Sequence, residues 1–327
     1  MVEVKHRKIE TNGISLHIAE AGEGPLVILC HGFPELWYSW RHQIPALAEA
    51  GYHVVAPDMR GYGGSDAPES VEAYSIFQLT GDMTGLVTAL GCDEAVIVGH
   101  DWGSIVAWQT ALFRPDMIRG VVGMSVPYTP RMPVRPTDLF RMISGDKFFY
   151  ILYFQDEGIA ENELEADVDR SMRMVMYTIS GSLSEGNALR TDLPAEGTGF
   201  LTGMYMPETL PSWLSEEDLA YYVDQFSQTG FRGGINWYRN FDRNWELTSP
   251  WAGAKITVPA VFMAGDRDPV VSGLFGGDGG GNMLGALDSF VPDLRSKVFI
   301  EGAGHWNQQE APEETTQALL TFLQDLD

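Results

Sequence analysis

The stretch Val98-Gly99-His100-Asp101-Trp102-Gly103-Ser104 decides the fold. It follows an apolar, β-branched run at residues 95–99 and precedes a helical pattern at residues 104–113. Two glycines flank the central acid at the spacing of a nucleophile elbow, the sharp strand-to-helix turn that lifts a catalytic side chain above a sheet. Asp101 is therefore the candidate nucleophile. The same carboxylate could instead cap the helix that begins beside it, and this motif alone leaves both interpretations open.

Further apolar runs along the chain also alternate with helical patterns. Continuous β-branched runs are typical of strands buried on both faces of a parallel sheet. We expect such strands at residues 26–30, 54–58, 95–99, 120–126, 260–265 and 297–302. Helical patterns occupy residues 76–90 and the segment that opens with Ala311-Pro312-Glu313-Glu314, where proline and acids suit a first turn. This alternation predicts an α/β fold with a doubly wound, mostly parallel sheet.

The alternation of predicted strands and helices stops at about residue 131 and resumes at Ile256. Between these points, residues 160–180 indicate a helix, and residues 215–226 begin with Ser-Glu-Glu-Asp, a typical helix N-terminus. We interpret residues 131–247 as a helical cap inserted into a core of residues 1–130 and 248–327. Residues 273–285 contain seven glycines but neither a GxGxxG nor a P-loop pattern. We expect a surface loop there, and its role stays open.

The composition narrows the class of partner. The 327 residues include 45 acidic and 21 basic side chains, for a net charge of −24. Such a surface repels nucleic acid and anionic membranes, and it suits a neutral or cationic substrate better than an anionic one. The N-terminus has no apolar signal segment and no run approaches the ~20 apolar residues of a membrane span. A cytoplasmic location is expected, and the sequence allows a homodimer without deciding the oligomeric state.

Metal chemistry is not indicated. The two cysteines, Cys30 and Cys92, form no CxxC pair, and the seven histidines include no HExxH or other ligand spacing. We therefore expect no metal and no cofactor.

Two more motifs lie where strands end. His31-Gly32-Phe33-Pro34 follows the strand predicted at residues 26–30. Its tight turn can aim the amide of Phe33 into the site, and the amide of Trp102 would be the second donor of an oxyanion hole. We interpret His31 itself as a turn residue.

The base and its orienting acid are expected late in the chain. His305 lies in Gly302-Ala303-Gly304-His305-Trp306, after the last predicted strand, where the base of this fold is found. The segment Ala264-Gly265-Asp266-Arg267-Asp268 offers two acids that could orient the imidazole. The chain order of nucleophile, acid and base fits an α/β hydrolase. Four matches in the right order favour the nucleophile interpretation of Asp101 over the helix cap.

Over nearly its whole length the sequence resembles the epoxide hydrolases of the α/β-hydrolase superfamily, especially the actinobacterial soluble type. The motifs that carry this resemblance are His31-Gly32-Phe33-Pro34-Glu35, Trp37-Tyr38-Ser39-Trp40-Arg41-His42-Gln43, Arg60-Gly61-Tyr62-Gly63-Gly64-Ser65, Gly99-His100-Asp101-Trp102-Gly103, Gly304-His305-Trp306 and Gln308-Gln309-Glu310. The glycine-rich residues that follow Val271 depart from the pattern of the family.

The resemblance implies roles for cap residues. Residues 149–155 (FYILYFQ) and 236–240 (NWYRN) resemble the stretches that supply the ring-opening tyrosines, which would be Tyr150 and Tyr238. Tyr153 is the neighbouring competitor, interpreted as a packing residue. The triad acid would be Asp268, with Asp266 as a turn residue.

The expected reaction needs only a small hydrophobic epoxide and water. Asp101 would form a covalent ester, and His305, which must be neutral to act, would activate water to hydrolyse it. The pocket wall is expected to be apolar and to include methionines of the cap together with Phe33, Pro34, Trp37, Trp102 and Trp237.

Two alternatives remain open. A haloalkane dehalogenase would share the fold and the Asp nucleophile, but it would hold halide with N–H donors and would not need paired cap tyrosines. A hydrolase-fold protein without catalysis would bind a ligand only, and it would be expected to have a broken triad. A serine esterase is excluded, because Ser104 lies three residues beyond the apex of the elbow.

Overall fold

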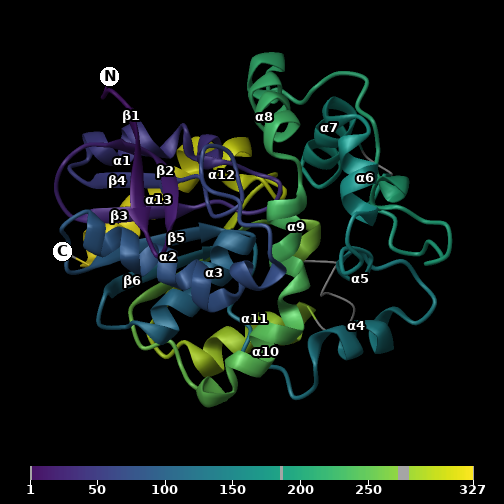
Figure 1. Cartoon of the computed structure of the whole chain (residues 1–327). Coiled ribbons are helices and arrows are strands. Elements are labelled where there is room, and N and C mark those ends of the chain that lie inside the picture. The colour runs from purple at the N-terminus through teal and green to yellow at the C-terminus, as the bar shows by residue number, and fades with distance from the viewer. Residues whose placement is uncertain (1, 185–186, 272–279, 327) are drawn as a thin grey trace.

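Eight strands form one sheet in the computed structural model, which describes residues 2–184, 187–271 and 280–326 (Figure 1). The spatial order is β1, β2, β4, β3, β5, β6, β7, β8. Strands β3 to β8 pair in parallel, and only β1–β2 and β2–β4 pair antiparallel. The strands are β1 (Lys5–Thr11), β2 (Ile14–Ala21), β3 (Leu26–Cys30), β4 (His53–Pro57), β5 (Ala95–His100), β6 (Ile118–Met124), β7 (Ala260–Gly265) and β8 (Leu294–Ile300).

The central strands are buried on both faces, which explains their continuous apolar sequences. Every residue of β3, β5 and β7 is buried. Because side chains alternate along a strand, Leu26 and Ile28 pack into one half of the core while Val27 and Leu29 pack into the other. The prediction of a doubly wound, mostly parallel α/β sheet is confirmed.

The first two strands were not predicted. β1 and β2 form an antiparallel hairpin at the sheet edge, and the turn between them is Asn12-Gly13. Both turn residues have positive φ, 46° and 75°, which is the geometry that a two-residue hairpin turn requires. β1 is mostly exposed and charged, so it lacks the apolar run by which the other strands were found.

Helices cover both faces of the sheet (Figure 1). α1 (Gln43–Glu49) and α13 (Pro312–Leu326) contact each other on one face, whereas α2 (Ile76–Ala89) and α3 (Trp102–Phe113) lie on the other. Short helical segments η1 (Trp37–Trp40), η2 (Val71–Tyr74), η4 (Ser249–Trp251) and α12 (Asn307–Glu310) connect these layers.

The chain between β6 and β7 is helical and lies beside the sheet, at the right of Figure 1. The segment predicted as one helix at residues 160–180 is two helices, because Asp167 begins a new helix by accepting a hydrogen bond from the amide of Arg170. Ser215 and Asp218 form a capping box at the start of α8. The helices are α4 (Pro136–Ser144), α5 (Tyr150–Tyr153), α6 (Ile159–Glu165), α7 (Val168–Thr178), η3 (Phe200–Gly203), α8 (Glu216–Thr229), α9 (Arg232–Arg239) and α10 (Phe241–Leu247).

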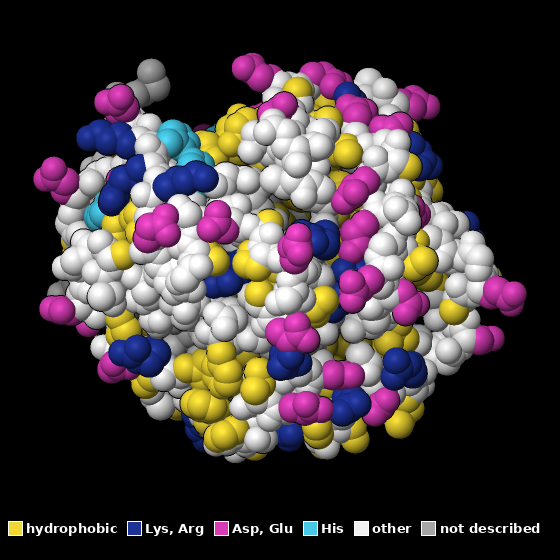
Figure 2. All heavy atoms as spheres, in the orientation of Figure 1, with side chains coloured by type: hydrophobic (Ala, Val, Ile, Leu, Met, Phe, Trp, Pro, Cys, Tyr) yellow, Lys and Arg dark blue, Asp and Glu magenta, His cyan; other side chains and the backbone are white. Residues whose placement is uncertain are grey.

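The second part of the glycine-rich stretch at 273–285 is helical. Residues 272–279 lie outside the described residues, but α11 (Gly280–Phe290) begins inside the stretch. The loop prediction is therefore wrong for residues 280–285, since helical hydrogen bonds can form without a β-carbon at each position. In the described part of the chain, no helix has both the length and the apolar character needed to cross a membrane. Acidic side chains are spread over the face in Figure 2 rather than gathered in one patch.

Candidate active site

Asp101 occupies a sharp turn between β5 and α3. Its backbone has φ 52° and ψ −118°, a strained region for a residue that is not glycine. A β-carbon at Gly99 would collide with the backbone of Gly103, and one at Gly103 would collide with the carbonyl of Cys30. The turn can close only because both flanking positions are glycine. Beyond the adjacent amide of Trp102, the Asp101 side chain makes no capping hydrogen bond to α3, so the helix-cap interpretation does not hold.

Two backbone amides point at this carboxylate instead. The amide of Phe33 donates to Oδ1 of Asp101 at 2.9 Å, and the amide of Trp102 donates to the same carboxylate. Burial raises the pKa of Asp101, although the positive charges of His305 and His100 and the two amides partly offset this effect. The two amides predicted as oxyanion donors therefore lie where an Asp101 oxygen would need them. Phe33 and Pro34 also line the adjacent cavity.

His305 lies on the loop after β8, with one ring nitrogen facing each of two carboxylates. Its Nδ1 is 3.1 Å from Oδ1 and 3.2 Å from Oδ2 of Asp268, and its Nε2 is 3.8 Å from Oδ2 of Asp101. The residue is 1% exposed. Burial lowers the pKa of His305, but Asp268, followed by the charges of Asp101 and Glu35, outweighs burial and raises the pKa to about 9. The free protein therefore holds an imidazolium between two acids at neutral pH.

The two candidate triad acids have different partners. Asp268 is 1% exposed, contacts the His305 ring and accepts the amide of Val270 at 2.8 Å. Asp266 is exposed, and its Oδ1 accepts the amide of Gly302 at 2.8 Å. The geometry brings Asp268, rather than Asp266, to the imidazole.

Tyr150 on α5 and Tyr238 on α9 lie side by side in the lining of the same cavity as Asp101. Their ring centroids are 5.7 Å apart and their hydroxyls are hydrogen-bonded. Burial, followed by the charge of Asp101, raises the pKa of both phenols above the usual 10. Both are therefore protonated hydrogen-bond donors at neutral pH. The hydroxyl of Tyr153 instead donates to Glu163 at 2.9 Å, and Tyr153 is absent from the cavity lining.

The three tryptophans that were predicted to form the pocket wall do not line the cavity. The indole of Trp102 donates to the hydroxyl of Tyr238 and stands edge-on to its ring, with centroids 5.1 Å apart. Trp37 donates to the hydroxyl of Tyr221 at 2.8 Å, and Trp237 donates to the carbonyl of Arg60 at 3.1 Å. Neither Trp37 nor Trp237 lines the cavity. Their predicted role in substrate contact is corrected to packing, because both rings are enclosed by other aromatic side chains.

The cavity has a volume of about 750 Å³, and its lining is mostly apolar. Phenylalanines and methionines of the helical segment form much of the wall, including Phe140, Phe149, Phe200, Met132 and Met204. A cavity of this size and character suits a hydrophobic ligand. Among the described residues, no three histidine, cysteine, aspartate or glutamate side chains are grouped so as to hold a metal ion.

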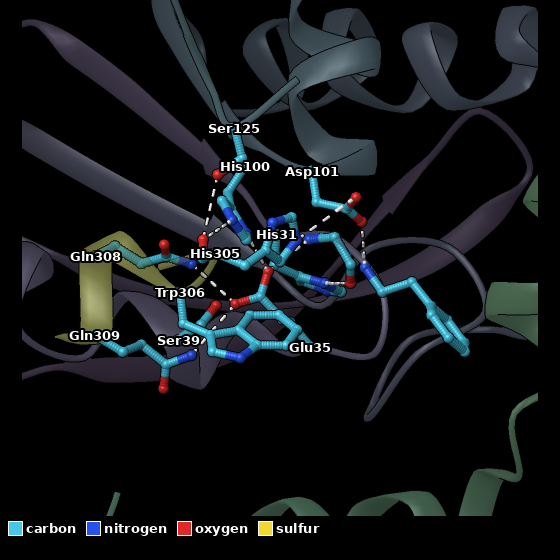
Figure 3. Close-up of polar contacts among 12 residues, drawn as sticks. His31, Glu35, Ser39, His100, Asp101, Ser125, His305, Trp306, Gln308 and Gln309 are labelled. Carbon is cyan, nitrogen blue, oxygen red and sulfur yellow. Dashed lines mark hydrogen bonds and ion pairs between the residues drawn. The ribbon is translucent and has the colours of Figure 1, made fainter. Parts of the chain in front are cut away.

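A buried polar network beneath the site was missed by sequence reasoning (Figure 3). His100 has both ring nitrogens in contact with acceptors, Nδ1 at 2.6 Å from Oε2 of Glu35 and Nε2 at 2.7 Å from the carbonyl of His305. A carbonyl oxygen only accepts, so Nε2 of His100 is the donor to the His305 carbonyl. Ser125 also donates to the His305 carbonyl, at 3.2 Å. The network thus holds the backbone of the candidate base.

Glu35 is the acceptor at the centre of this network. It is fully buried, and it accepts the amide of Gly32 at 3.1 Å and the side chains of Gln308 and Gln309 at 2.8 and 3.3 Å. Burial raises the pKa of Glu35, but His100 outweighs it, so the net shift is downward. Glu35 and His100 stand inside the two turn motifs found by sequence, and an acid directly after His-Gly-Phe-Pro was the available signal.

Comparisons with known proteins agree with this geometry. The α/β hydrolase fold family model matches residues 25–312. Epoxide hydrolase A of Mycobacterium tuberculosis (strain ATCC 25618 / H37Rv) is 49% identical over 323 residues, covering 98% of each chain. Among solved structures, epoxide hydrolase A from Mycobacterium thermoresistibile has a TM-score of 0.91 at 49% identity, covering 98% of each chain. An epoxide hydrolase from an endophytic Streptomyces has a TM-score of 0.94 at 42% identity, covering 99% of this chain and 96% of that one.

Proposed function

The chain belongs to the epoxide hydrolases of the α/β hydrolase family, and from that premise we propose that it opens an epoxide through a covalent ester on Asp101, which water activated by His305 then hydrolyses. The observation that carries the proposal is the shared cavity in which Asp101, His305, Tyr150 and Tyr238 meet. A carboxylate can displace at a saturated carbon without first losing a proton, whereas a serine would need a base.

We further propose that residues 131–247 act as a cap over a core of residues 1–130 and 248–327. This division is supported by the position of α4 to α10 between β6 and β7. The cap would supply Tyr150 on α5 and Tyr238 on α9, while the core would supply Asp101 at the carboxyl end of strand β5. The epoxide would be held between the two parts against an apolar wall.

In the first step, Oδ2 of Asp101 attacks an epoxide carbon, and the bond from that carbon to the epoxide oxygen breaks. The hydroxyls of Tyr150 and Tyr238 donate to this oxygen as its negative charge develops, which is general acid help worth about 10²- to 10⁴-fold. The indole of Trp102 can only donate, so its contact with the Tyr238 oxygen leaves the Tyr238 proton directed elsewhere.

The proton balance of this step involves His305. Before reaction, the Asp101 carboxylate and the His305 imidazolium carry opposite charges. Ester formation removes the Asp101 charge, which is one of the causes that raise the pKa of His305. The imidazolium then releases a proton as the new alkoxide gains one, and a neutral imidazole remains to act as the base.

In the second step, His305 takes a proton from water, and the oxygen of that water attacks the carbonyl carbon of the Asp101 ester. Oδ1 of Asp101 becomes the oxyanion, and the amides of Phe33 and Trp102 already point at this carboxylate. Loss of one such donor typically costs about 3 kcal/mol. The acyl carbon–oxygen bond then breaks, and the leaving diol takes the proton from His305.

A single-turnover reaction in ¹⁸O-labelled water tests this route. We expect one labelled oxygen in the peptide that contains Asp101 and an unlabelled diol from the first turnover, detected by mass spectrometry. Asp101→Asn should lose at least about 10³-fold in kcat, as nucleophile removal does in other hydrolases. Label in the first diol, or a fully active Asp101→Asn protein without deamidation, would contradict the covalent route.

A chloroalkane serves as the control substrate. A dehalogenase would need N–H donors for the halide, but the Trp102 indole is engaged by Tyr238. We expect diol from styrene oxide and no halide from the chloroalkane. Halide release without diol formation would favour the dehalogenase instead.

A further inference from the structure

Glu310 fastens the loop that carries His305 to the helical segment between β6 and β7. Its Oε2 accepts the amide of Gly181 at 2.8 Å and the amide of Gly304 at 3.0 Å, and its Oε1 accepts the amide of Trp306 at 2.9 Å. Gly304 and Trp306 are the two chain neighbours of His305, whereas Gly181 lies 129 positions before Glu310. One carboxylate therefore binds the backbone on both sides of the candidate base and joins it to a distant segment.

A purely local role does not account for these contacts. Trp306 is the N-cap of α12, whose last residue is Glu310, and amides at the start of a helix need acceptors from outside the helical ladder. The bond from Trp306 to Oε1 would meet that need alone. The two bonds to Oε2 are additional, and the one from Gly181 crosses from the proposed cap to the core.

The two joined segments also meet backbone to backbone. A β-carbon at Gly181 would collide with the carbonyl oxygen of Gly302, and one at Gly304 would collide with the amide nitrogen of Gly181. Glycine permits such a close approach because it has no β-carbon. The loop of the base and residues 180–181 thus fix each other in place.

Two further hydrogen bonds extend this contact toward the cavity. The amide of His305 donates to the carbonyl of Ile179 at 2.9 Å, and the indole of Trp306 donates to the carbonyl of Met176 at 2.8 Å. Met176 belongs to α7, and Ile179 directly follows that helix. Ile179 lines the cavity together with Val175 and His305. A ligand against this wall would touch a residue that is one hydrogen bond away from the backbone of the base.

We infer that Glu310 is a positioning residue for His305, and that it acts by locking the loop of the base to residues 176–181 of the proposed cap. This inference rests on the proposed epoxide hydrolase function. The Glu310 carboxylate faces backbone amides rather than the reacting atoms, so it acts on the chemistry only through the place it gives to the imidazole.

The expected consequence differs between the two chemical steps. Ester formation uses Asp101, Tyr150 and Tyr238, which lie at the β5–α3 turn, on α5 and on α9. Ester hydrolysis needs the imidazole of His305 to hold a water in line with the ester carbonyl, and a misplacement of about 1 Å can cost about 10²-fold. Loss of the Glu310 carboxylate should therefore slow the second step and spare the first.

Single-turnover kinetics with styrene oxide and excess enzyme test this difference. Glu310→Gln keeps the size of the side chain but replaces one acceptor oxygen by an NH2 group, which cannot accept an amide. Stopped-flow tryptophan fluorescence follows ester formation, and intact-protein mass spectrometry after acid quench follows the ester itself. We expect ester hydrolysis to slow about 10- to 100-fold and the ester to accumulate, while ester formation keeps the wild-type rate constant.

Companion variants keep the test informative if folding is impaired. Partial unfolding lowers the amplitude of a single turnover but not its rate constants. Gly181→Ala pushes apart the same contact from the cap side and should show the same difference between the steps. Glu310→Asp shortens the reach toward Gly181 and replaces the glutamine variant if that protein does not fold. Glu301→Gln is the matched control, because Glu301 is exposed at the start of the same loop, and it should change neither step.

Each outcome bears on a stated claim. Equal slowing of both steps in Glu310→Gln, as a general loss of packing would give, overturns the positioning role, and so does an unchanged rate of ester hydrolysis. A Gly181→Ala protein with wild-type ester hydrolysis overturns the link to the cap. Absence of both ester and diol in the wild type counts against the proposed function and against the role of Glu310 that presumes it.

Discussion

Nε2 of His305 lies 3.8 Å from Oδ2 of Asp101. This separation exceeds a hydrogen bond, so the imidazole faces the nucleophile without being tied to it. The other ring nitrogen, Nδ1, is held by Asp268 at 3.1 Å. His305 is thus positioned between a carboxylate that keeps its charge through the proposed cycle and one that loses its charge when the ester forms.

The first prediction concerns pH. The pKa of His305 is about 9 in the free protein. Burial lowers this pKa, but the charges of Asp268 and then Asp101 raise it by more. Esterification of Asp101 removes one raising charge, so we expect the hydrolysis of preformed ester to rise with pH to a midpoint below 9. Single-turnover kinetics after rapid mixing, over about pH 5–10, would measure it as the ionisation of a general base. A rate that does not vary over this range would exclude His305 as the base.

The raised pKa of His305 also makes the stability of the folded protein depend on pH. A pKa raised above the usual 6.5 for histidine stabilises the folded state fully below pH 6.5 and loses that effect as pH rises through about 9. Asp101→Asn removes a raising charge, so the His305 pKa should be lower in this variant when followed by NMR. An unchanged His305 pKa in Asp101→Asn would show that the two groups are not coupled.

The second prediction separates two neighbouring acids. Asp268→Asn leaves the shape of the side chain but removes the charge that faces His305, so kcat should fall by about 10⁴-fold, the loss typical of a triad acid. Asp266→Asn is the matched control, because Asp266 is exposed and its carboxylate accepts the amide of Gly302. Its kcat should stay within about twofold, as expected for a surface residue. A reversed order of the two effects would assign the triad to Asp266.

The third prediction uses three tyrosines of the cap. Tyr150→Phe and Tyr238→Phe should each slow ester formation by up to about 10²- to 10⁴-fold, because each removes a donor to the epoxide oxygen. Tyr153→Phe removes a hydroxyl bonded to Glu163 outside the cavity, and it should leave the rate unchanged. Stopped-flow tryptophan fluorescence can follow the ester phase. Equal effects in all three variants would indicate a general loss of cap packing rather than loss of a specific donor.

The fourth prediction concerns the buried pair beneath the site. Glu35→Gln keeps the side-chain volume but removes the buried carboxylate that accepts the amide of Gly32 and faces Nδ1 of His100. Loss of hydrogen bonds to a charged group should cost about 1.5–3 kcal/mol in urea unfolding. The pKa of Glu35 is lowered on balance, so the pair stabilises above the usual 4.5 and this contribution is lost as pH falls through the folded pKa. The exposed Asp116→Asn breaks a pair with Arg114 and should not change stability measurably. A Glu35→Gln protein as stable as wild type would contradict a stabilising role for the ionised Glu35 carboxylate.

The sequence predicted the structure correctly where a local sequence pattern directly reflects burial or a tight turn. Strands such as β3 and β5 are apolar because both faces are covered, and the elbow at Asp101 needs glycine on each side. The β1–β2 hairpin had a signal, since Asn12-Gly13 is a favoured two-residue turn. It was missed because the exposed β1 lacks apolar residues.

Other features depend on contacts that no local pattern contains. Trp37 and Trp237 stand next to site motifs, but their rings pack against partners far away in the chain, such as Tyr221 and Tyr62. The Glu35–His100 pair joins residues 65 positions apart. Whether a polar residue in a turn faces the cavity or the layer beneath it is set by tertiary packing.

The last prediction tests the elbow itself. A β-carbon at Gly103 would meet the carbonyl of Cys30, which belongs to a central strand that cannot easily move. Gly103→Ala should therefore cost about 1–3 kcal/mol of stability through overpacking, and it should displace Asp101 enough to lower kcat. Gly285→Ala on α11 is the matched control, since a β-carbon there would meet no atom of the described residues within 4 Å. That change should stabilise by about 0.5–1 kcal/mol, because alanine is the better helix former. Thermal unfolding and epoxide turnover of both variants would test this prediction. A Gly103→Ala protein with wild-type stability and kcat would show that the tight turn does not determine the position of Asp101.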